Sequence, residues 1–214
     1  MSPLFRAVLF DFDGTLADSF TAIAASVNHV RAHNGLSPMT EDEVKKLVGR
    51  GLPQLIADVV PAGNHPANVA LYYSHHPSVM FEQTRLLPGV LDSLIALHQA
   101  GVKLGVCSNK PSSITRKLVE SLDIQQYFDA TLGPEDSGIP KPDPAMLELA
   151  LRMLGARTSE ALYVGDMAID IETARNAGMP VWVLPTGSGD RQSLLQAKPD
   201  RLLENMGELA PAML

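Results

Sequence analysis

The chain has 214 residues, enough for one well-buried core and a modest second domain but too few for two large domains. Its hydrophobic content of 45% and charged content of 19% are typical of a globular protein and argue against a disordered one. The formal net charge of -7 argues against a nucleic-acid partner, because no basic surface is available to neutralise a phosphate backbone.

The single cysteine, Cys107, excludes an intramolecular disulfide, and we expect it to be a small buried hydrophobe. The first apolar run, residues 7–10, is too short for a signal peptide or a membrane span. We therefore expect a cytoplasmic protein with no membrane partner.

Five short apolar runs predict buried strands, with helix-like stretches between them. The runs are residues 7–10, 102–107, 128–132, 161–164 and 181–184. Glycines suited to left-handed helix ends precede three of the strands, namely Gly101, Gly155 and Gly178. Pro144 is expected in the first turn of a helix, and Ser112 or Ser113 as the N-cap of the helix that runs to Leu122. The alternation predicts an α/β fold with a Rossmann-like parallel sheet covered by helices on both faces.

One stretch interrupts this alternation. Residues 16–87 contain no strand-like run and show helical periodicity instead. The sequence therefore predicts an α/β core domain formed by residues 1–15 and 88–214, with an all-helical domain, residues 16–87, inserted after the first strand.

Polar residues follow four of the apolar segments. They are Asp11 to Thr15, Ser108-Asn109-Lys110, Lys141, and Asp166 with Asp170. Because ligands bind at the carboxyl ends of parallel strands, we expect these groups to converge at one edge of the sheet. Carboxylates, a lysine and a hydroxyl at one edge suit a phosphoryl group bound to a hard cation.

Two further features of the sequence are not expected to take part in the reaction. The pair His75-His76 lies in the helical insert without a partner at ligand spacing, so both are expected to be surface residues rather than metal ligands. The segment Gly187-Ser188-Gly189 lacks the glycine fingerprint of a dinucleotide site, and we expect a flexible loop near the rim of the site.

The four polar segments resemble the four motifs of the haloacid dehalogenase superfamily over most of the chain. The motifs are Asp11-x-Asp13-Gly14-Thr15, Ser108, Lys141-Pro142-x-Pro144 and Gly165-Asp166-x-x-x-Asp170. The helical insert resembles the cap of the subgroup that contains phosphoglycolate phosphatase and β-phosphoglucomutase. Residues 48–53 and the tail 185–209 look closest to phosphoglycolate phosphatases. The resemblance implies a magnesium-dependent phosphatase with a cap that closes over the site.

The same resemblance implies roles for individual residues. Asp11 would be the nucleophile that forms an aspartyl phosphate, and Asp13 the general acid and base. Mg²⁺ would be held by the carboxylates of Asp11 and Asp166 and by the backbone carbonyl of Asp13.

The remaining motif residues would bind the substrate or support those that do. Lys141 and Ser108 would contact the phosphoryl oxygens, with help from Thr15 and from the backbone around Asn109. Asp170 would orient Lys141 or a metal-bound water. In the cap, Arg50 would grip a second anionic group such as a carboxylate.

Several alternatives stay open from the sequence. By resemblance the substrate is a small phosphate ester, best 2-phosphoglycolate, although caps of this kind also serve sugar phosphates and nucleotides. A phosphosugar mutase of the β-phosphoglucomutase type is the nearest alternative. A receiver-like signalling module is disfavoured because it needs neither the insert nor Asp13. The sequence does not determine the oligomeric state.

Overall fold

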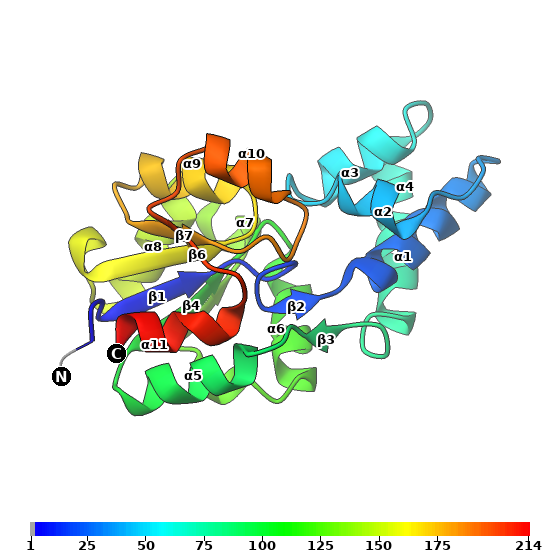
Figure 1. Cartoon of the computed structure of the whole chain (residues 1–214). Helices are drawn as coiled ribbons and strands as arrows, with labels where there is room; N and C mark the ends of the chain where they lie inside the picture. The colour runs from blue at the N-terminus through cyan, green and yellow to red at the C-terminus, as the bar shows by residue number, and fades with distance from the viewer. Residues whose placement is uncertain (1–2) are drawn as a thin grey trace.

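The structure, a computed structural model, describes residues 3–214. The described chain forms an α/β core with a helical unit projecting from one end of it (Figure 1). The core sheet contains six parallel strands in the order β5-β4-β1-β6-β7-β8. The strands are β1 (Ala7–Phe10), β4 (Lys103–Cys107), β5 (Ala130–Leu132), β6 (Ala161–Gly165), β7 (Val181–Val183) and β8 (Arg201–Leu202). The predicted parallel α/β core is confirmed.

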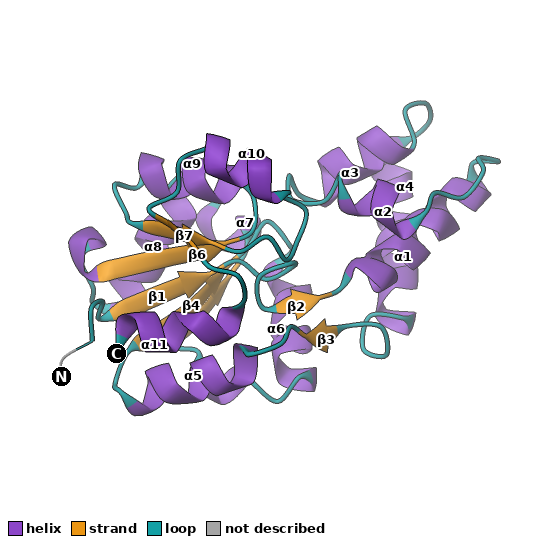
Figure 2. Ribbon diagram, in the orientation of Figure 1, coloured by secondary structure: helices purple, strands orange, loops and turns teal. Residues whose placement is uncertain are grey.

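Helices cover both faces of the sheet (Figure 2). Alternate residues of β1 point to opposite faces, so Val8 and Phe10 pack in one hydrophobic cluster, whereas Ala7 and Leu9 pack in the other. The first cluster includes side chains from α5 (Val90–Gln99), α6 (Ser112–Ser121) and α11 (Leu209–Met213). The second includes side chains from α8 (Ala145–Leu154), α9 (Ala168–Asn176) and α10 (Arg191–Gln196). The chain therefore buries β1 between two helical layers.

The helical unit between β1 and β4 has its own hydrophobic core. It consists of α1 (Phe20–His33), α2 (Glu41–Lys45), α3 (Leu52–Val59), α4 (His65–His75) and the 3₁₀ turn η1 (His76–Ser78). We call residues 20–78 the cap. Two short antiparallel strands, β2 (Ala17–Asp18) and β3 (Arg85–Leu86), pair where the chain leaves and re-enters the core. The domain boundaries proposed at 15/16 and 87/88 lie just outside this ribbon and stay a prediction.

The structure corrects several local expectations. The strand expected at residues 128–132 begins at Ala130, because η2 (Gln125–Tyr127) precedes it. Neither Ser112 nor Ser113 caps α6, since both lie in the helix and Pro111 holds the N-cap position. The strands β2, β3 and β8 were not predicted, because two residues show no periodicity. The remaining short elements are α7 (Pro134–Ser137), η3 (Thr158–Glu160) and η4 (Met206–Glu208).

Glycines end the helices as expected. Gly155 is the left-handed C-cap of α8, with a φ of 64°. Gly101 and Gly178 directly follow the C-caps of α5 and α9 and also have positive φ. Within residues 3–214, no helix is both long and apolar enough to cross a membrane.

Candidate active site

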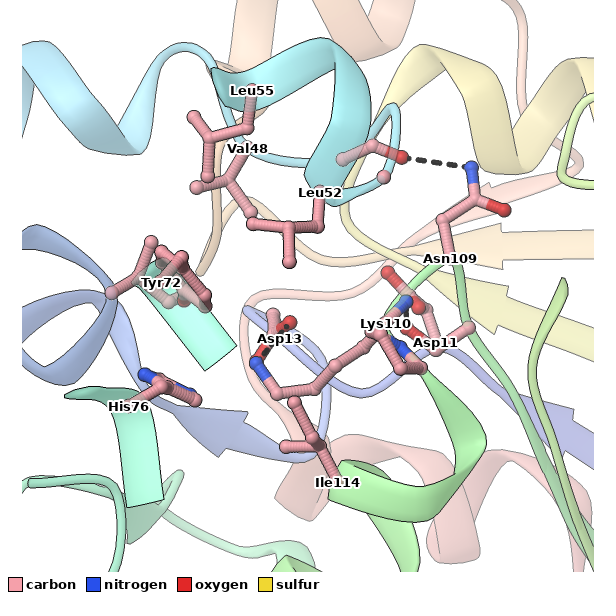
Figure 3. A pocket seen from close by; sticks show the side chains of 15 residues that line it. Asp11, Asp13, Val48, Leu52, Leu55, Tyr72, His76, Asn109, Lys110 and Ile114 are labelled. Carbon is pink, nitrogen blue, oxygen red and sulfur yellow. Dashed lines mark hydrogen bonds and ion pairs between the residues drawn. The ribbon is translucent and has the colours of Figure 1, made fainter. Parts of the chain in front are cut away.

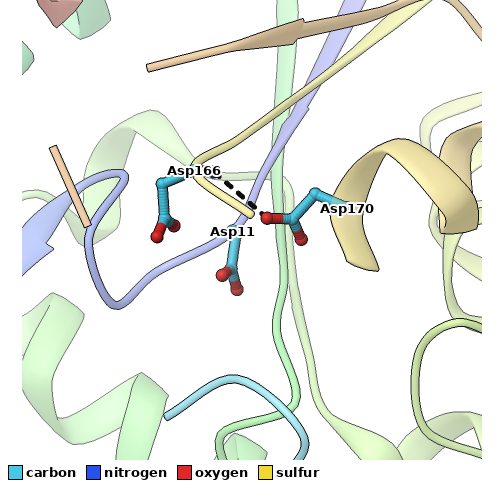
Figure 4. A group of neighbouring side chains, drawn as sticks. All are labelled: Asp11, Asp166 and Asp170. Atoms are coloured by element: carbon cyan, nitrogen blue, oxygen red, sulfur yellow. Dashed lines mark hydrogen bonds between the residues drawn. The ribbon is translucent and has the colours of Figure 1, made fainter. Parts of the chain in front are cut away.

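The register of the sheet brings the polar strand ends together. Phe10 at the end of β1 is paired with Val106 of β4 and with Val164 of β6. The next residues along these strands therefore meet at the same edge of the sheet. Figure 4 shows the side chains of Asp11, Asp166 and Asp170 gathered at this edge.

Lys141 lies at the centre of this edge and is almost fully buried. Its ammonium lies 3.0 Å from Oδ1 of Asp11 and 2.7 Å from Oδ1 of Asp170, and it also donates to the hydroxyl of Tyr163 at 3.0 Å. Burial alone would lower the pKa of Lys141, but the carboxylates of Asp11 and Asp170 raise it above its ordinary value. The lysine is therefore a fixed cation beside Asp11.

Three carboxylates share this edge with one ammonium. Asp11, Asp166 and Asp170 each offer an oxygen within 4.8 Å of the others, and all three are buried. Burial, and then repulsion from Asp170 and Asp11, raises the pKa of Asp166 well above its ordinary value. Within the described residues, Oδ1 of Asp11 is paired with the Lys141 ammonium at 3.0 Å. Three buried carboxylates with one ammonium between two of them leave an excess of negative charge, which fits a hard divalent cation.

Asp166 is held by a tight cradle. The Thr15 hydroxyl donates to Oδ1 at 2.9 Å, and the Ser188 amide donates to Oδ2 at 2.9 Å. A Cβ added to Gly187 would stand 1.8 Å from Oδ2 of Asp166, and one added to Gly14, whose φ is +88°, would stand 2.7 Å from the same oxygen. Only glycine fits at both places.

This cradle adds contacts to two expectations from the sequence. The loop at residues 187–189 packs directly on Asp166, with Ser188 as a donor. The Thr15 hydroxyl donates to Asp166, and its help in binding the phosphoryl group stays a prediction. The missed signal was the pair of glycines, which marks a close approach of backbone to a side chain.

Asp170 holds Lys141 in place. One of its oxygens accepts from Lys141, and the other accepts from the backbone amides of Asp166 at 3.1 Å and Met167 at 2.9 Å. The latter bond closes the first turn of α9 as a capping box. Of the two partners expected for Asp170, Lys141 is thus in contact with it.

Asp13 is paired with a residue to which the sequence reading gave no role. The ammonium of Lys110 lies 3.0 Å from each carboxylate oxygen of Asp13, and the Ser19 hydroxyl also donates to Asp13. Both Lys110 and Asp13 are buried and face the same cavity. Their pairing depends on how β1 and β4 lie in space, so the sequence spacing alone gives no sign of it.

Ser108 and Asn109 follow β4 and make different sets of hydrogen bonds. The Ser108 hydroxyl oxygen accepts from the Lys110 amide at 3.3 Å, and no acceptor within residues 3–214 takes its proton. The Asn109 amide group donates to the carbonyls of Gly49 at 3.0 Å and Lys141 at 3.1 Å, and its oxygen accepts from the Lys141 amide at 2.7 Å. Asn109 therefore ties the cap to the loop that carries Lys141.

A cavity lies between the core and the cap (Figure 3). The core contributes its polar wall, with Asp11, Asp13, Ser108, Asn109 and Lys110. The cap contributes a largely apolar wall that includes Ile23, Val48, Leu52, Leu55, Tyr72 and His76. A phosphate ester held at Asp11 would therefore place its leaving group against the cap.

Three other residues named from the sequence lie at an exposed position, in the cavity wall and in the core. Arg50 is exposed and is not among the residues that line the cavity. His76 was expected at the surface, but it is 1% exposed and lines the cavity, because η1 folds it under α1 and α4. Cys107 is a free, fully buried cysteine, as expected, and burial raises the pKa of its thiol.

Comparison with curated proteins gives a consistent set of relatives. A phosphoglycolate phosphatase from Agrobacterium fabrum is 31% identical over 99% of this chain and 93% of its own length. A phosphoglycolate phosphatase from Rhodospirillum rubrum is 35% identical over 85% of this chain and 80% of its own length. Both matches include the core and the cap.

Comparison with solved structures extends the likeness to the fold. A predicted phosphoglycolate phosphatase from Haemophilus somnus superposes with a TM-score of 0.89 and 26% identity, covering 98% of each chain. The family described as haloacid dehalogenase-like hydrolase matches residues 8–184, which carry all four polar segments. The chain therefore belongs to the haloacid dehalogenase-like hydrolase family.

Proposed function

We propose that the protein is a magnesium-dependent phosphatase that hydrolyses a small phosphate monoester through an aspartyl-phosphate intermediate on Asp11. The observation that carries this proposal is the placement of Asp11. It is buried at the end of the central strand, 3.0 Å from Lys141, and it faces the same cavity as Asp13. The names of the relatives at 31–35% identity support a phosphatase.

In the first half of the reaction, a carboxylate oxygen of Asp11 attacks the phosphorus. The bond between phosphorus and the ester oxygen breaks, and Asp13 gives a proton to the departing alcohol. Lys141 fixes Asp11 and places a positive charge beside the phosphoryl group. The proton of Ser108 is available to a phosphoryl oxygen.

In the second half, a water molecule attacks the phosphorus of the aspartyl phosphate. Asp13 takes a proton from this water, and the bond between phosphorus and the Asp11 oxygen breaks. Inorganic phosphate and the free carboxylate of Asp11 result. Asp13 thus acts as an acid and then as a base, and its position next to the nucleophile in both sequence and space suits both steps.

The carboxylates of Asp11 and Asp166 would hold the metal, with the backbone carbonyl of Asp13 as a further ligand. Bound Mg²⁺ would neutralise the repulsion between these carboxylates and the phosphate. Asp170 is the third member of the acidic group, but its oxygens are occupied by Lys141 and two backbone amides. We propose that it positions Lys141 rather than binding the metal.

The relatives' name makes 2-phosphoglycolate the first candidate substrate. Arg50, the residue proposed from the sequence to grip its carboxylate, is exposed. Its neighbours Gly49 and Gly51 line the cavity, and contact between Arg50 and the substrate stays a prediction. The cavity joins the polar strand ends of the core to the largely apolar cap wall, which is the arrangement expected for a phosphate ester with a small leaving group.

The test is repeated release of inorganic phosphate from p-nitrophenyl phosphate in the presence of magnesium. We expect many turnovers by the wild type, loss of turnover in Asp11→Asn and Asp13→Asn, and near-normal turnover in Asp42→Asn, which changes an exposed carboxylate. A single stoichiometric phosphorylation would instead favour a receiver-like module. Interconversion of hexose phosphates without net hydrolysis would favour a mutase. Activity at the wild-type level in either active-site variant would refute the proposal.

A further inference from the structure

His76 is a buried polar side chain on the largely apolar cap wall of the cavity. It is 1% exposed, and its Nε2 atom has no hydrogen-bond partner among the described residues. Its ring stacks on Tyr72 with the ring centroids 4.9 Å apart. Figure 3 shows it beside Tyr72, across the cavity from Lys110 and Asp13. A buried polar atom without a partner is costly, and a ligand is the simplest partner for one that lines a cavity.

The surroundings of the ring determine which nitrogen carries the proton. The Ser26 hydroxyl donates to the carbonyl of Ala22 at 3.0 Å, and its oxygen lies 2.9 Å from Nδ1 of His76 and 3.2 Å from Nδ1 of His75. A hydroxyl has one proton, so assigning that proton to Ala22 makes both Nδ1 atoms donors to the Ser26 oxygen. We infer this tautomer, in which His76 carries its proton on Nδ1 and Nε2 is a hydrogen-bond acceptor.

The charge state of His76 agrees with this assignment. Burial, followed by the nearby Lys110 cation, lowers the pKa of His76 to about 3. The imidazole is therefore neutral at pH 7, and in this tautomer Nε2 carries a lone pair rather than a proton.

The other charges of the cavity do not favour a second anionic group on the substrate. Of the described residues that line the cavity, Lys110 is the one lysine and none is an arginine, and Lys110 is already paired with Asp13. Besides His76, Tyr72 adds a hydroxyl to a cap wall whose other side chains are aliphatic. A carboxylate brings only acceptors, which the Nε2 lone pair repels, whereas an alcohol brings a proton to it.

We propose that His76 determines substrate specificity by accepting a hydrogen bond from a hydroxyl group on the leaving alcohol. The cap then selects phosphate monoesters of neutral, hydroxyl-bearing alcohols over esters whose leaving group carries a carboxylate. This inference rests on the proposed phosphatase function and narrows its substrate class. It ranks hydroxylated esters above 2-phosphoglycolate. His76 acts on selection among esters, not on the phosphoryl transfer itself.

The test uses three matched series of esters with two to six carbons in the leaving group. One series ends in a methyl group, one in a hydroxyl and one in a carboxylate, with 2-phosphoglycolate as the shortest carboxylate. Chain length then scans the distance between the phosphate and His76. At one chain length or more, we expect kcat/KM for the hydroxyl ester to exceed that of the methyl and carboxylate esters of the same length by about tenfold. This is the effect expected when a buried hydrogen-bond acceptor gains a donor.

The variant His76→Phe keeps an aromatic ring against Tyr72 and removes the acceptor. We expect its ratio of kcat/KM between hydroxyl and methyl esters to fall to within twofold of 1. His75→Phe changes the neighbouring histidine, which shares Ser26 but does not line the cavity, and is expected to keep the wild-type ratio. Because each ratio is taken within one enzyme, a general loss of activity does not affect it.

Two-dimensional ¹⁵N NMR of the wild type gives a second readout that does not depend on a variant that folds. At pH 7 we expect Nδ1 of His76 to be protonated and Nε2 to be unprotonated. A proton on Nε2, a preference for carboxylate esters, or a hydroxyl preference that is absent in the wild type or retained in His76→Phe would each overturn the inference. If the wild type hydrolyses neither these esters nor p-nitrophenyl phosphate, the proposed function itself fails, and the inference fails with it.

Discussion

The ammonium of Lys141 lies 3.0 Å from Oδ1 of Asp11, and the two side chains are only 1% and 7% exposed. A second buried carboxylate, Asp170, lies 2.7 Å from the same ammonium. Lys141 therefore neutralises the charge of Asp11, the proposed nucleophile, and also holds its carboxylate in position. Removing one partner of a buried ion pair leaves uncompensated charge, which is far more costly than loss of an exposed pair.

Lys141→Met is expected to lower the free energy of unfolding by roughly 3–5 kcal/mol in metal-free buffer, because Asp11 and Asp170 lose their counter-ion. It is also expected to lower kcat/KM by about 10²–10³-fold. Lys103→Met is the matched control, since Lys103 forms an exposed pair with Asp129 at 2.9 Å and should contribute less than about 1 kcal/mol. Urea denaturation and steady-state kinetics measure both. Equal destabilisation by the two variants would contradict the role of Lys141.

Asn109→Ala removes one hydrogen bond to the cap, at Gly49, and two to the backbone of Lys141. We expect a loss of about 1–3 kcal/mol of stability and a rise in KM, because buried backbone groups lose their partner. Asn176→Ala is the control, since its amide makes one exposed bond, to Pro142 at 3.0 Å. If both variants changed stability and KM to the same extent, Asn109 would not couple the cap to the core.

Magnesium is expected to stabilise the protein independently of turnover. A ligand that binds only the folded state at about 100 times its Kd adds roughly 2.7 kcal/mol to stability. Mg²⁺ should therefore raise the Tm of the wild type, and Asp166→Asn should lose most of this shift. Asp42→Asn, an exposed change, should keep it. An undiminished shift in Asp166→Asn would place the metal elsewhere, and chelation of the metal is expected to stop turnover.

His76 should make the stability of the fold depend on pH. Its pKa is lowered to about 3 in the folded protein, whereas an unfolded histidine titrates near 6.5. Below pH 6.5 the unfolded state thus binds more protons, so the stability that His76 contributes is full above pH 6.5 and is lost as the pH falls toward 3. From pH 6.5 to 5 the loss is about 2 kcal/mol, at 1.36 kcal/mol per unit.

Urea denaturation at pH 7.5, 6.0 and 5.0 measures this effect. Other titrating groups contribute alike to the wild type and to His76→Phe, so the difference between the two isolates His76. The variant should lose about 2 kcal/mol less stability than the wild type over this range. Parallel curves for the two proteins would show that His76 is not buried in its neutral form.

The sequence predicted the parts of the fold that rest on local pattern and on parallel pairing. The apolar runs marked the central strands, and the convergence of Asp11, Ser108 and Asp166 follows from the carboxyl ends of β1, β4 and β6 meeting at one edge. The structure places Lys141 beside Asp11 at the same edge.

Other parts depend on contacts between distant segments, which leave no local pattern. The buried position of His76 depends on Ser26, fifty residues earlier, and on the packing of η1 under α1. Lys110 pairs with Asp13 across two strands, and Ser188 reaches Asp166 from the loop after β7. Arg50 is exposed and lies outside the cavity lining, so the role in binding suggested by its charge stays a prediction.

The formation of an aspartyl phosphate on Asp11 is the central claim, and chemical trapping tests it most directly. The wild type is quenched during turnover of p-nitrophenyl phosphate and reduced with borohydride, which converts a phosphorylated aspartate to homoserine, and its peptides are then sequenced by mass spectrometry. We predict homoserine at position 11 and unchanged aspartate at positions 13, 166 and 170. Homoserine at any of those three positions, or none at all during sustained turnover, would contradict the account.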